Sequence, residues 1–238
     1  MSSPELSVVI PVYNEEDSLP LLVPSVVEAM EEIGRDYEVL LIDDGSRDAS
    51  FAKMVELKGR YTKLRCLKFR RNAGQTAAMW AGFQNARGDI VITLDADMQN
   101  DPKDIPKLLE KMPEYDTVVG WRAKRNDPPW RLVQSRIANW IRNKLSGEQI
   151  ADTGCSLKAY KRECLQNLKL YKGLHRFLPT LIKMEGYAVA EVAVSHRPRE
   201  HGQSKYGMWN RAIPAFKDLL AVRWMKKRHI KFEIEVEK

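Results

Sequence analysis

Three residues with oxygen-bearing side chains, Asp95, Asp97 and Gln99, follow the apolar segment 90–94 at alternate positions. Because successive side chains of an extended segment point to opposite sides, these three are expected to face one site. Such oxygens suit hard divalent cations, and Mg²⁺ usually takes one or two carboxylates together with substrate phosphates. The spacing therefore predicts a site for a metal and a phosphorylated ligand. The alternative is an acidic loop that caps a following helix, with Pro102 near its start.

Two further polar segments stand where other expected strands end. Asn14 and Glu15 follow the strand expected over 6–12, and Asp44 follows the strand expected over 37–43. A carboxylate in this place can accept hydrogen bonds from the base or the ribose of a nucleotide. Taken singly, each segment is better explained as a strand-to-helix turn, since acidic residues favour the N-terminus of a helix.

Short runs rich in Val and Ile alternate with helical patterns through the first half of the chain. This alternation predicts βαβ units and a mostly parallel sheet covered on both faces. Ligands of such sheets bind outside the carboxyl ends of the strands, where the polar segments fall. We therefore predict an α/β fold, a single domain with a mostly parallel, mixed central sheet flanked by helices. Strands are expected over 6–12, 37–43, 64–69, 90–94, 117–120 and 188–196, and helices over 17–33, 48–60, 74–85, 131–145 and 206–225.

Composition and charge narrow the class of protein. The chain has 238 residues, of which 44% are hydrophobic and 30% charged, as in ordinary globular domains. A formal net charge of +7 suits anionic partners. No nucleic-acid-binding motif or basic-aromatic ladder accompanies this charge, so we expect no nucleic-acid partner. No signal peptide is expected, and the three cysteines, which lack metal-ligand spacing, are expected to be reduced thiols.

The order and spacing of the polar segments resemble the nucleotide-sugar half of glycosyltransferase family 2, which has the Rossmann-like GT-A fold. Segments 72–75 and 88–89 fit the same pattern. Further motifs resemble dolichyl-phosphate mannose synthases and their bacterial polyprenyl-phosphate relatives, and the resemblance covers essentially the whole chain. It implies an inverting transfer of a sugar from a GDP- or UDP-linked donor to a dolichyl or undecaprenyl phosphate, with Mg²⁺ or Mn²⁺. These motifs are Gly120-Trp121-Arg122, Arg131, Asp152-Thr153-Gly154-Cys155 and the segment 199–206.

The resemblance also implies roles for individual residues. The three residues of the acidic motif would hold the metal, and Asp97 would be catalytic. Arg122 and Arg131 would clamp the acceptor phosphate. The role of Asp152 is open: it would orient the sugar or an arginine, or act as a base. The donor would be bound by Pro11, Tyr13, Glu15, Asp44, Asp95, Ala96, Arg199 and Lys205.

A phosphate acceptor fits elementary chemistry. The planar fork of arginine binds two phosphate oxygens at once, and a phosphate monoester, with a second pKa near ~6, is largely dianionic at pH 7. Such a nucleophile has little need of a strong base, so positioning and charge stabilisation would dominate. A saccharide or glycolipid acceptor would instead need a positioned base, and the pair of Arg122 and Arg131 favours phosphate. A non-catalytic nucleotide-sugar sensor or membrane scaffold would have lost the metal ligands, which this chain retains.

The expected domain covers 1–225, with a nucleotide-sugar half over about 1–120, an acceptor half over about 121–225 and a charged tail over 226–238. No run of about 20 apolar residues predicts a transmembrane segment. The last expected helix carries Trp209, Phe216 and Trp224 on one stripe, which either packs in the core or lies in the membrane interface beside basic residues. A third alternative is docking onto a membrane-embedded protein partner. We expect a cytoplasmic protein at the inner face of the membrane.

Overall fold

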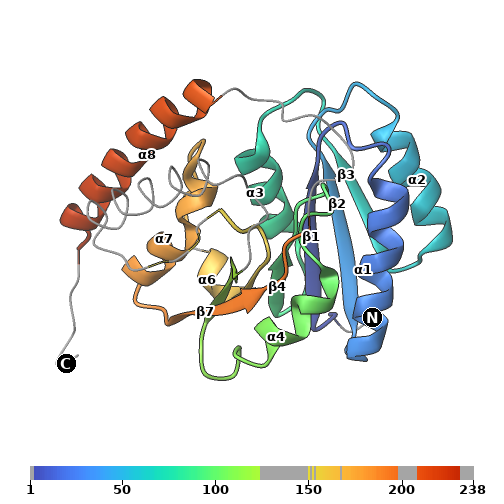
Figure 1. The fold of residues 1–238 in the computed structure, drawn as a ribbon, viewed down its shortest axis with the longest axis horizontal. Helices are drawn as coiled ribbons and strands as arrows, with labels where there is room; N and C mark the ends of the chain where they lie inside the picture. Colours follow the sequence, from blue (N-terminus) through green and yellow to red (C-terminus); the bar gives the residue numbers. More distant parts are fainter. Residues whose placement is uncertain are drawn as a thin grey trace, which may run out of the picture.

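One mixed sheet forms the centre of the protein. The computed structural model describes residues 3–123, 150, 152, 154–166, 168–197 and 208–230, with side chains from 214 onward in the last range. In this part of the chain, seven strands lie in the order β3-β2-β1-β4-β6-β5-β7 (Figure 1). The strands are β1 (Leu6–Val12), β2 (Tyr37–Asp43), β3 (Leu64–Lys68), β4 (Ile90–Thr93), β5 (Thr117–Arg122), β6 (Lys158–Lys161) and β7 (Val189–Val194).

The pairing confirms the predicted mixed sheet. β1 pairs in parallel with β2 and β4, β2 with β3, and β5 with β7, whereas β6 runs antiparallel between β4 and β5. The sequence did not predict β6, because a four-residue strand with a lysine at each end shows no clear apolar pattern. β5 extends two residues further than expected, to Arg122, and so carries this arginine at its end.

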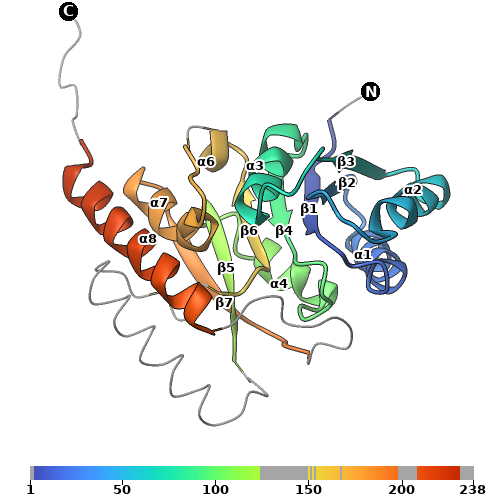
Figure 2. The ribbon, with the colours of Figure 1, turned by 90° about the horizontal axis from the view of Figure 1, so that it is seen from above.

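Helices cover both faces of the sheet. Along β1, Val8 and Ile10 pack into a core shared with α1, α2 and α4, whereas Val9 packs into a second core shared with α3, α6, α7 and α8. Figure 2 shows these two layers on opposite sides of the strands, with α8 running outside α7. The helices are α1 (Leu19–Ile33), α2 (Ser50–Arg60), α3 (Gln75–Asn85), η1 (Pro102–Asp104), α4 (Ile105–Leu109), α6 (Glu163–Gln166), η2 (Leu174–Phe177), α7 (Leu178–Met184) and α8 (Met208–Arg228).

Several element boundaries differ from the prediction. α1 and α2 begin two residues later than expected, since the residues before them form turns. Before α2, for example, Asp48 accepts hydrogen bonds from the backbone and side chain of Ser50. The expected strand 188–196 is shorter at both ends. The helix expected over 131–145 lies outside the described residues.

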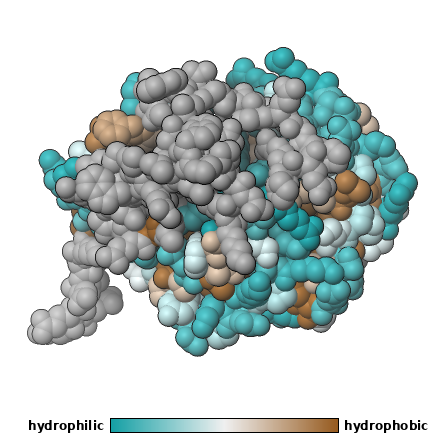
Figure 3. Space-filling model, in the orientation of Figure 1, coloured by the Kyte–Doolittle hydropathy of each residue, from teal (hydrophilic) through white to brown (hydrophobic). Residues whose placement is uncertain are grey.

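The outer face of α8 is apolar and exposed. Phe216, Leu220 and Trp224 are 50%, 44% and 64% exposed, whereas Leu219 and Val222 are the buried apolar residues among the side chains of α8 described from residue 214 on. The stripe is therefore not core packing at these three positions. In Figure 3 an apolar patch lies at the edge of the molecule where α8 runs. Within the described residues, no helix is both long and apolar enough to cross a bilayer.

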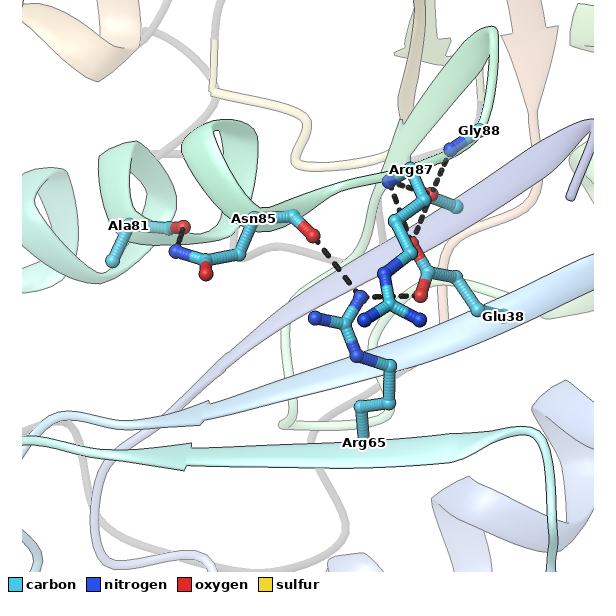
Figure 4. Close-up of polar contacts among 7 residues, drawn as sticks. Glu38, Arg65, Ala81, Asn85, Arg87 and Gly88 are labelled. Carbon is cyan, nitrogen blue, oxygen red and sulfur yellow. Dashed lines mark hydrogen bonds and ion pairs between the residues drawn. The ribbon is translucent and has the colours of Figure 1, made fainter. Parts of the chain in front are cut away.

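A buried carboxylate joins three segments at the amino ends of the strands, at the opposite end of the sheet from the cleft described below. Glu38 on β2 accepts hydrogen bonds from Ser7 Oγ and from the backbone N–H of Arg87, both at 2.7 Å, and pairs with Arg65 on β3 (Figure 4). Arg65 also donates to the carbonyl of Asn85, the last residue of α3, at 3.0 Å. This network fixes the C-terminal end of α3 against the sheet.

Replacing Glu38 with alanine is expected to lower the free energy of unfolding by about 3 kcal/mol or more, because it leaves buried donors and a half-buried arginine without their acceptor. Urea denaturation of the purified protein measures this loss. Glu28→Ala is the matched control, since Glu28 forms an exposed ion pair with Lys103 and its replacement should leave the midpoint unchanged. Equal midpoints for the two variants would show that the Glu38 network contributes no stability.

Candidate functional site

A cleft of about 550 Å³ opens at the carboxyl ends of the central parallel strands. It brings together nine of the thirteen residues to which the sequence assigned a role in the site, from four different loops or strand ends. Arg131, Arg199 and Lys205 lie outside the described residues. The nine are Pro11, Tyr13, Glu15, Asp44, Asp95, Ala96, Asp97, Gln99 and Arg122.

Side-chain hydrogen bonds lock the loop after β1 to the loop after β2. Asn14 has a positive φ of 52°, which its short polar side chain tolerates, and its Oδ1 accepts the backbone N–H of Arg47 at 2.8 Å. In return, Ser46 Oγ accepts the N–H of Asn14, and Ser50 Oγ accepts the N–H of Glu15 at 2.8 Å. The two loops therefore form one rigid wall of the cleft.

Asp44 organises a second stretch of this wall. Its carboxylate accepts the backbone N–H groups of Ala73 and Gly74 and the side-chain amide of Asn72, at 2.7 to 2.9 Å. Burial raises the pKa of Asp44, whereas the hydrogen bonds from these donors lower it in part. Gly45 has a φ of 68° and no room for a Cβ, which would lie 2.6 Å from the backbone of Arg71. Besides the predicted nucleotide contact, Asp44 thus shapes the loop that leads into α3.

The acidic motif turns instead of running straight. Met98 has a φ of 60°, and Asp97 Oδ1 accepts the backbone N–H of Gln99 at 3.2 Å. The prediction of an extended segment is therefore wrong after Asp97, because the chain turns there. Asp95, Asp97 and Gln99 nevertheless all line the cleft, and Gln75 at the start of α3 donates to Asp95 Oδ1 at 2.9 Å.

Ser156 holds the acidic motif against the segment before β6. Its hydroxyl accepts the backbone N–H of Asp95 at 3.2 Å and donates to Asn100 Oδ1 at 2.7 Å. Its carbonyl accepts the hydroxyl of Thr93 at 2.6 Å. Sequence reasoning did not single out these positioning residues, because Ser156 and Asn100 are far apart along the chain.

Asp152 holds Arg122. Its two oxygens accept Nε of Arg122 at 2.6 Å and Nη2 at 3.0 Å, and Oδ1 also accepts the backbone N–H of Gly154 at 3.0 Å. Both side chains are mostly buried. This bidentate ion pair fixes the plane of the Arg122 guanidinium at the edge of the cleft. Of the roles left open for Asp152, the geometry favours orienting an arginine.

The acidic motif fits a divalent cation of the Mg²⁺ or Mn²⁺ kind. Two carboxylates and one amide oxygen, from Asp95, Asp97 and Gln99, reach the same cleft. Among the described residues, no three acidic, histidine or cysteine side chains gather into a metal site of their own. Since Asp95, Asp97 and Gln99 offer few oxygens, substrate oxygens would complete the shell of a bound Mg²⁺.

A mostly parallel sheet that carries an acidic motif and a fixed arginine around one cleft fits the GT-A class of glycosyltransferases. Comparison with known proteins agrees with this class. Residues 7–169 match the family described as "Glycosyl transferase family 2", and the chain belongs to this family.

Curated relatives extend the comparison. The chain is 40% identical over 233 residues to the dodecaprenyl-phosphate galacturonate synthase of Rhizobium johnstonii, covering 95% of this chain and 69% of the relative. It is 42% identical over 205 residues to the undecaprenyl-phosphate 4-deoxy-4-formamido-L-arabinose transferase of Aeromonas hydrophila, covering 85% and 63%. The chain thus spans somewhat under two thirds of the length of the second relative.

Solved structures share the fold. Glucosyl-3-phosphoglycerate synthase from Mycobacterium tuberculosis, in complex with Mn²⁺, UDP and phosphoglyceric acid, superposes with a TM-score of 0.70 at 19% identity, covering 96% of this chain and 80% of that one. At this identity the likeness concerns the fold. It confirms the predicted GT-A architecture.

Proposed function

We propose that the protein transfers a sugar from a nucleotide-sugar to a polyprenyl phosphate, with inversion at the anomeric carbon. The observation that carries the proposal is that one cleft holds both the acidic motif and an arginine fixed for phosphate binding. The two relatives named above act, by their names, on dodecaprenyl and undecaprenyl phosphate. In this proposal the cleft would bind the donor at the acidic motif and the acceptor phosphate at Arg122.

The reaction is a single displacement. An oxygen of the acceptor phosphate attacks the anomeric carbon of the sugar. The bond between this carbon and the donor diphosphate breaks, and the nucleoside diphosphate leaves. A divalent cation, Mg²⁺ or Mn²⁺, held by Asp95, Asp97 and Gln99 would offset the charge of the leaving diphosphate. Arg122, oriented by Asp152, would hold the attacking phosphate in line, so that two anions can approach each other.

A transfer assay tests this function. Purified protein would be incubated with Mn²⁺ or Mg²⁺, radiolabelled GDP- and UDP-sugars and a short polyprenyl phosphate. Label that moves into the organic phase only with metal and acceptor supports the proposal and names the donor. If label moves only to an added saccharide or glycolipid, the proposal is wrong and the acceptor is a hydroxyl group of that class of molecule. A protein that binds donor but transfers to neither acceptor would be a binding module.

The proposed acceptor requires access to a membrane, and α8 offers a surface for it. Its exposed stripe of Phe216, Leu220 and Trp224 is followed by Lys226, Lys227 and Arg228 in the last turn. Apolar side chains beside lysine and arginine suit the interface of an anionic bilayer. We propose that α8 lies on the inner face of the membrane, beside the acceptor, with the rest of the protein in the cytoplasm.

Replacing Phe216, Leu220 and Trp224 together with alanine is expected to weaken binding to vesicles containing anionic lipid by about 10- to 100-fold, because the apolar area buried in the interface is lost. Vesicle flotation measures the bound fraction. Leu21→Ala with Val55→Ala is the matched control, since these residues are 48% and 52% exposed on α1 and α2. Equal binding by all three proteins would remove α8 as the anchor and favour a membrane-embedded protein partner.

A further inference from the structure

Three basic side chains gather in the wall of the cleft and have no role in the reaction described so far. Lys158 comes from β6, and His175 and Arg176 come from η2. The charges of Arg176 and Lys158 both lower the pKa of His175, so His175 lies within electrostatic reach of both cations. Their meeting in the cleft could not be predicted from the sequence, because Lys158 and His175 are 17 residues apart and belong to short elements.

His175 is held as a neutral ring. Burial, followed by the nearby cations, lowers its pKa to about 3. Its Nδ1 lies 2.7 Å from Thr76 Oγ1 at the start of α3, and the same oxygen accepts the backbone N–H of Gly173. When the Thr76 hydroxyl donates to Nδ1, Nε2 carries the proton of the ring, and the ring can then donate a hydrogen bond in the cleft.

The two cations are also held in place. Lys158 is 3% exposed; burial lowers its pKa, and the charges of Asp95 and Asp152 act in the opposite direction. Burial raises the pKa of Asp218 on α8, and the charge of Arg176 acts in the opposite direction, so these two side chains lie close enough to interact. A buried ammonium in a ligand cleft is costly unless anions surround it. An anion bound beside Lys158 would further stabilise its charged form.

We propose that Lys158, His175 and Arg176 form a subsite for the carboxylate of a uronic acid carried by the donor, which makes the enzyme selective for nucleotide-uronates over the matching neutral sugars. This inference rests on the proposed function, in which the cleft binds a nucleotide-sugar. Two cations and one neutral donor suit a singly charged, planar carboxylate, which accepts several charge-assisted hydrogen bonds.

The other anions of the reaction already have partners elsewhere in the cleft. The donor diphosphate would sit on the cation held by Asp95 and Asp97, and the acceptor phosphate on Arg122. A third anionic group is therefore the one that the basic cluster fits. A neutral hexose would leave the cluster facing a hydroxymethyl group, which offers only a neutral acceptor.

Paired donors test the proposal by direct binding. Calorimetry with Mn²⁺ would compare UDP-galacturonate with UDP-galactose, UDP-glucuronate with UDP-glucose, and GDP-mannuronate with GDP-mannose. In at least one pair the uronate is expected to bind about 10- to 100-fold more tightly. Arg176→Met should reduce this preference about 10-fold or more and leave the affinity for the neutral partner nearly unchanged. Lys158→Met should act in the same direction.

Arg60→Met is the matched control, because Arg60 is an exposed arginine on α2 that pairs with Glu56 and lies outside the cleft. Equal affinity of the wild type for both members of every pair would overturn the subsite. An unchanged donor preference in Arg176→Met, together with a raised KM for polyprenyl phosphate, would also overturn the subsite. It would indicate that the cluster binds the acceptor phosphate instead. Because binding is measured without acceptor, loss of lipid transfer alone would count against the proposed function and not against the subsite.

Discussion

Asp97→Asn is expected to reduce sugar transfer about 10³-fold or more in kcat while leaving the fold intact. Asparagine keeps the shape of the side chain and an oxygen that can accept the N–H of Gln99, as Asp97 Oδ1 does at 3.2 Å. It removes the negative charge that would hold a divalent cation against the leaving diphosphate. Since charge stabilisation of the leaving group is the main task of this half of the site, its loss falls on kcat.

The measurement is lipid transfer at saturating donor, paired with Mn²⁺ titration by electron paramagnetic resonance. Asp89→Asn is the matched control: Asp89 precedes the same strand, β4, at its opposite end, is largely exposed and pairs only weakly with Arg162. Wild-type metal affinity and activity are expected for this control. If Asp97→Asn kept full activity, or bound Mn²⁺ as the wild type does, the acidic motif would not be the metal site.

Much of the donor side of the cleft could be predicted from the sequence, because it is built from strand ends. Once β1, β2 and β4 are recognised as parallel strands, the segments that follow them must meet at one edge of the sheet. The positions of Tyr13, Asp44 and Asp95 in the cleft follow from this rule. The turn at Met98 did not, since a positive φ in a residue other than glycine has no sequence signal.

The part of the cleft that comes from the second half of the chain was harder to predict for a physical reason. Lys158 and His175 come from short elements, β6 and η2, which leave no periodic pattern to read. Lys158 lies beside β4 and β5 only through antiparallel pairing over long sequence separations, and His175 reaches Thr76 across 99 residues. Tertiary contacts of this kind depend on the whole packing of the domain. The resemblance to a family supplied Arg122 and Asp152, while their direct pairing came from the structure.

Arg122→Gln is expected to lower kcat/KM for polyprenyl phosphate about 10²- to 10³-fold, because the acceptor phosphate loses its fixed cation. Asp152→Asn should lower it about 10- to 100-fold, since Arg122 remains but is no longer held by a charged partner. If Asp152 only positions Arg122, the double variant should be no worse than Arg122→Gln alone. Two independent roles would instead multiply the two losses.

Kinetics of the four proteins across pH separate positioning from base catalysis. A phosphate acceptor that is already ionised needs no base, so Asp152→Asn should keep the shape of the wild-type pH profile at reduced height. Removing one partner of a mostly buried pair also destabilises the fold, so thermal unfolding must first show each variant to be folded at the assay temperature. A multiplicative double variant, together with loss of the pH dependence in Asp152→Asn, would make Asp152 a general base and would favour a hydroxyl acceptor over a phosphate.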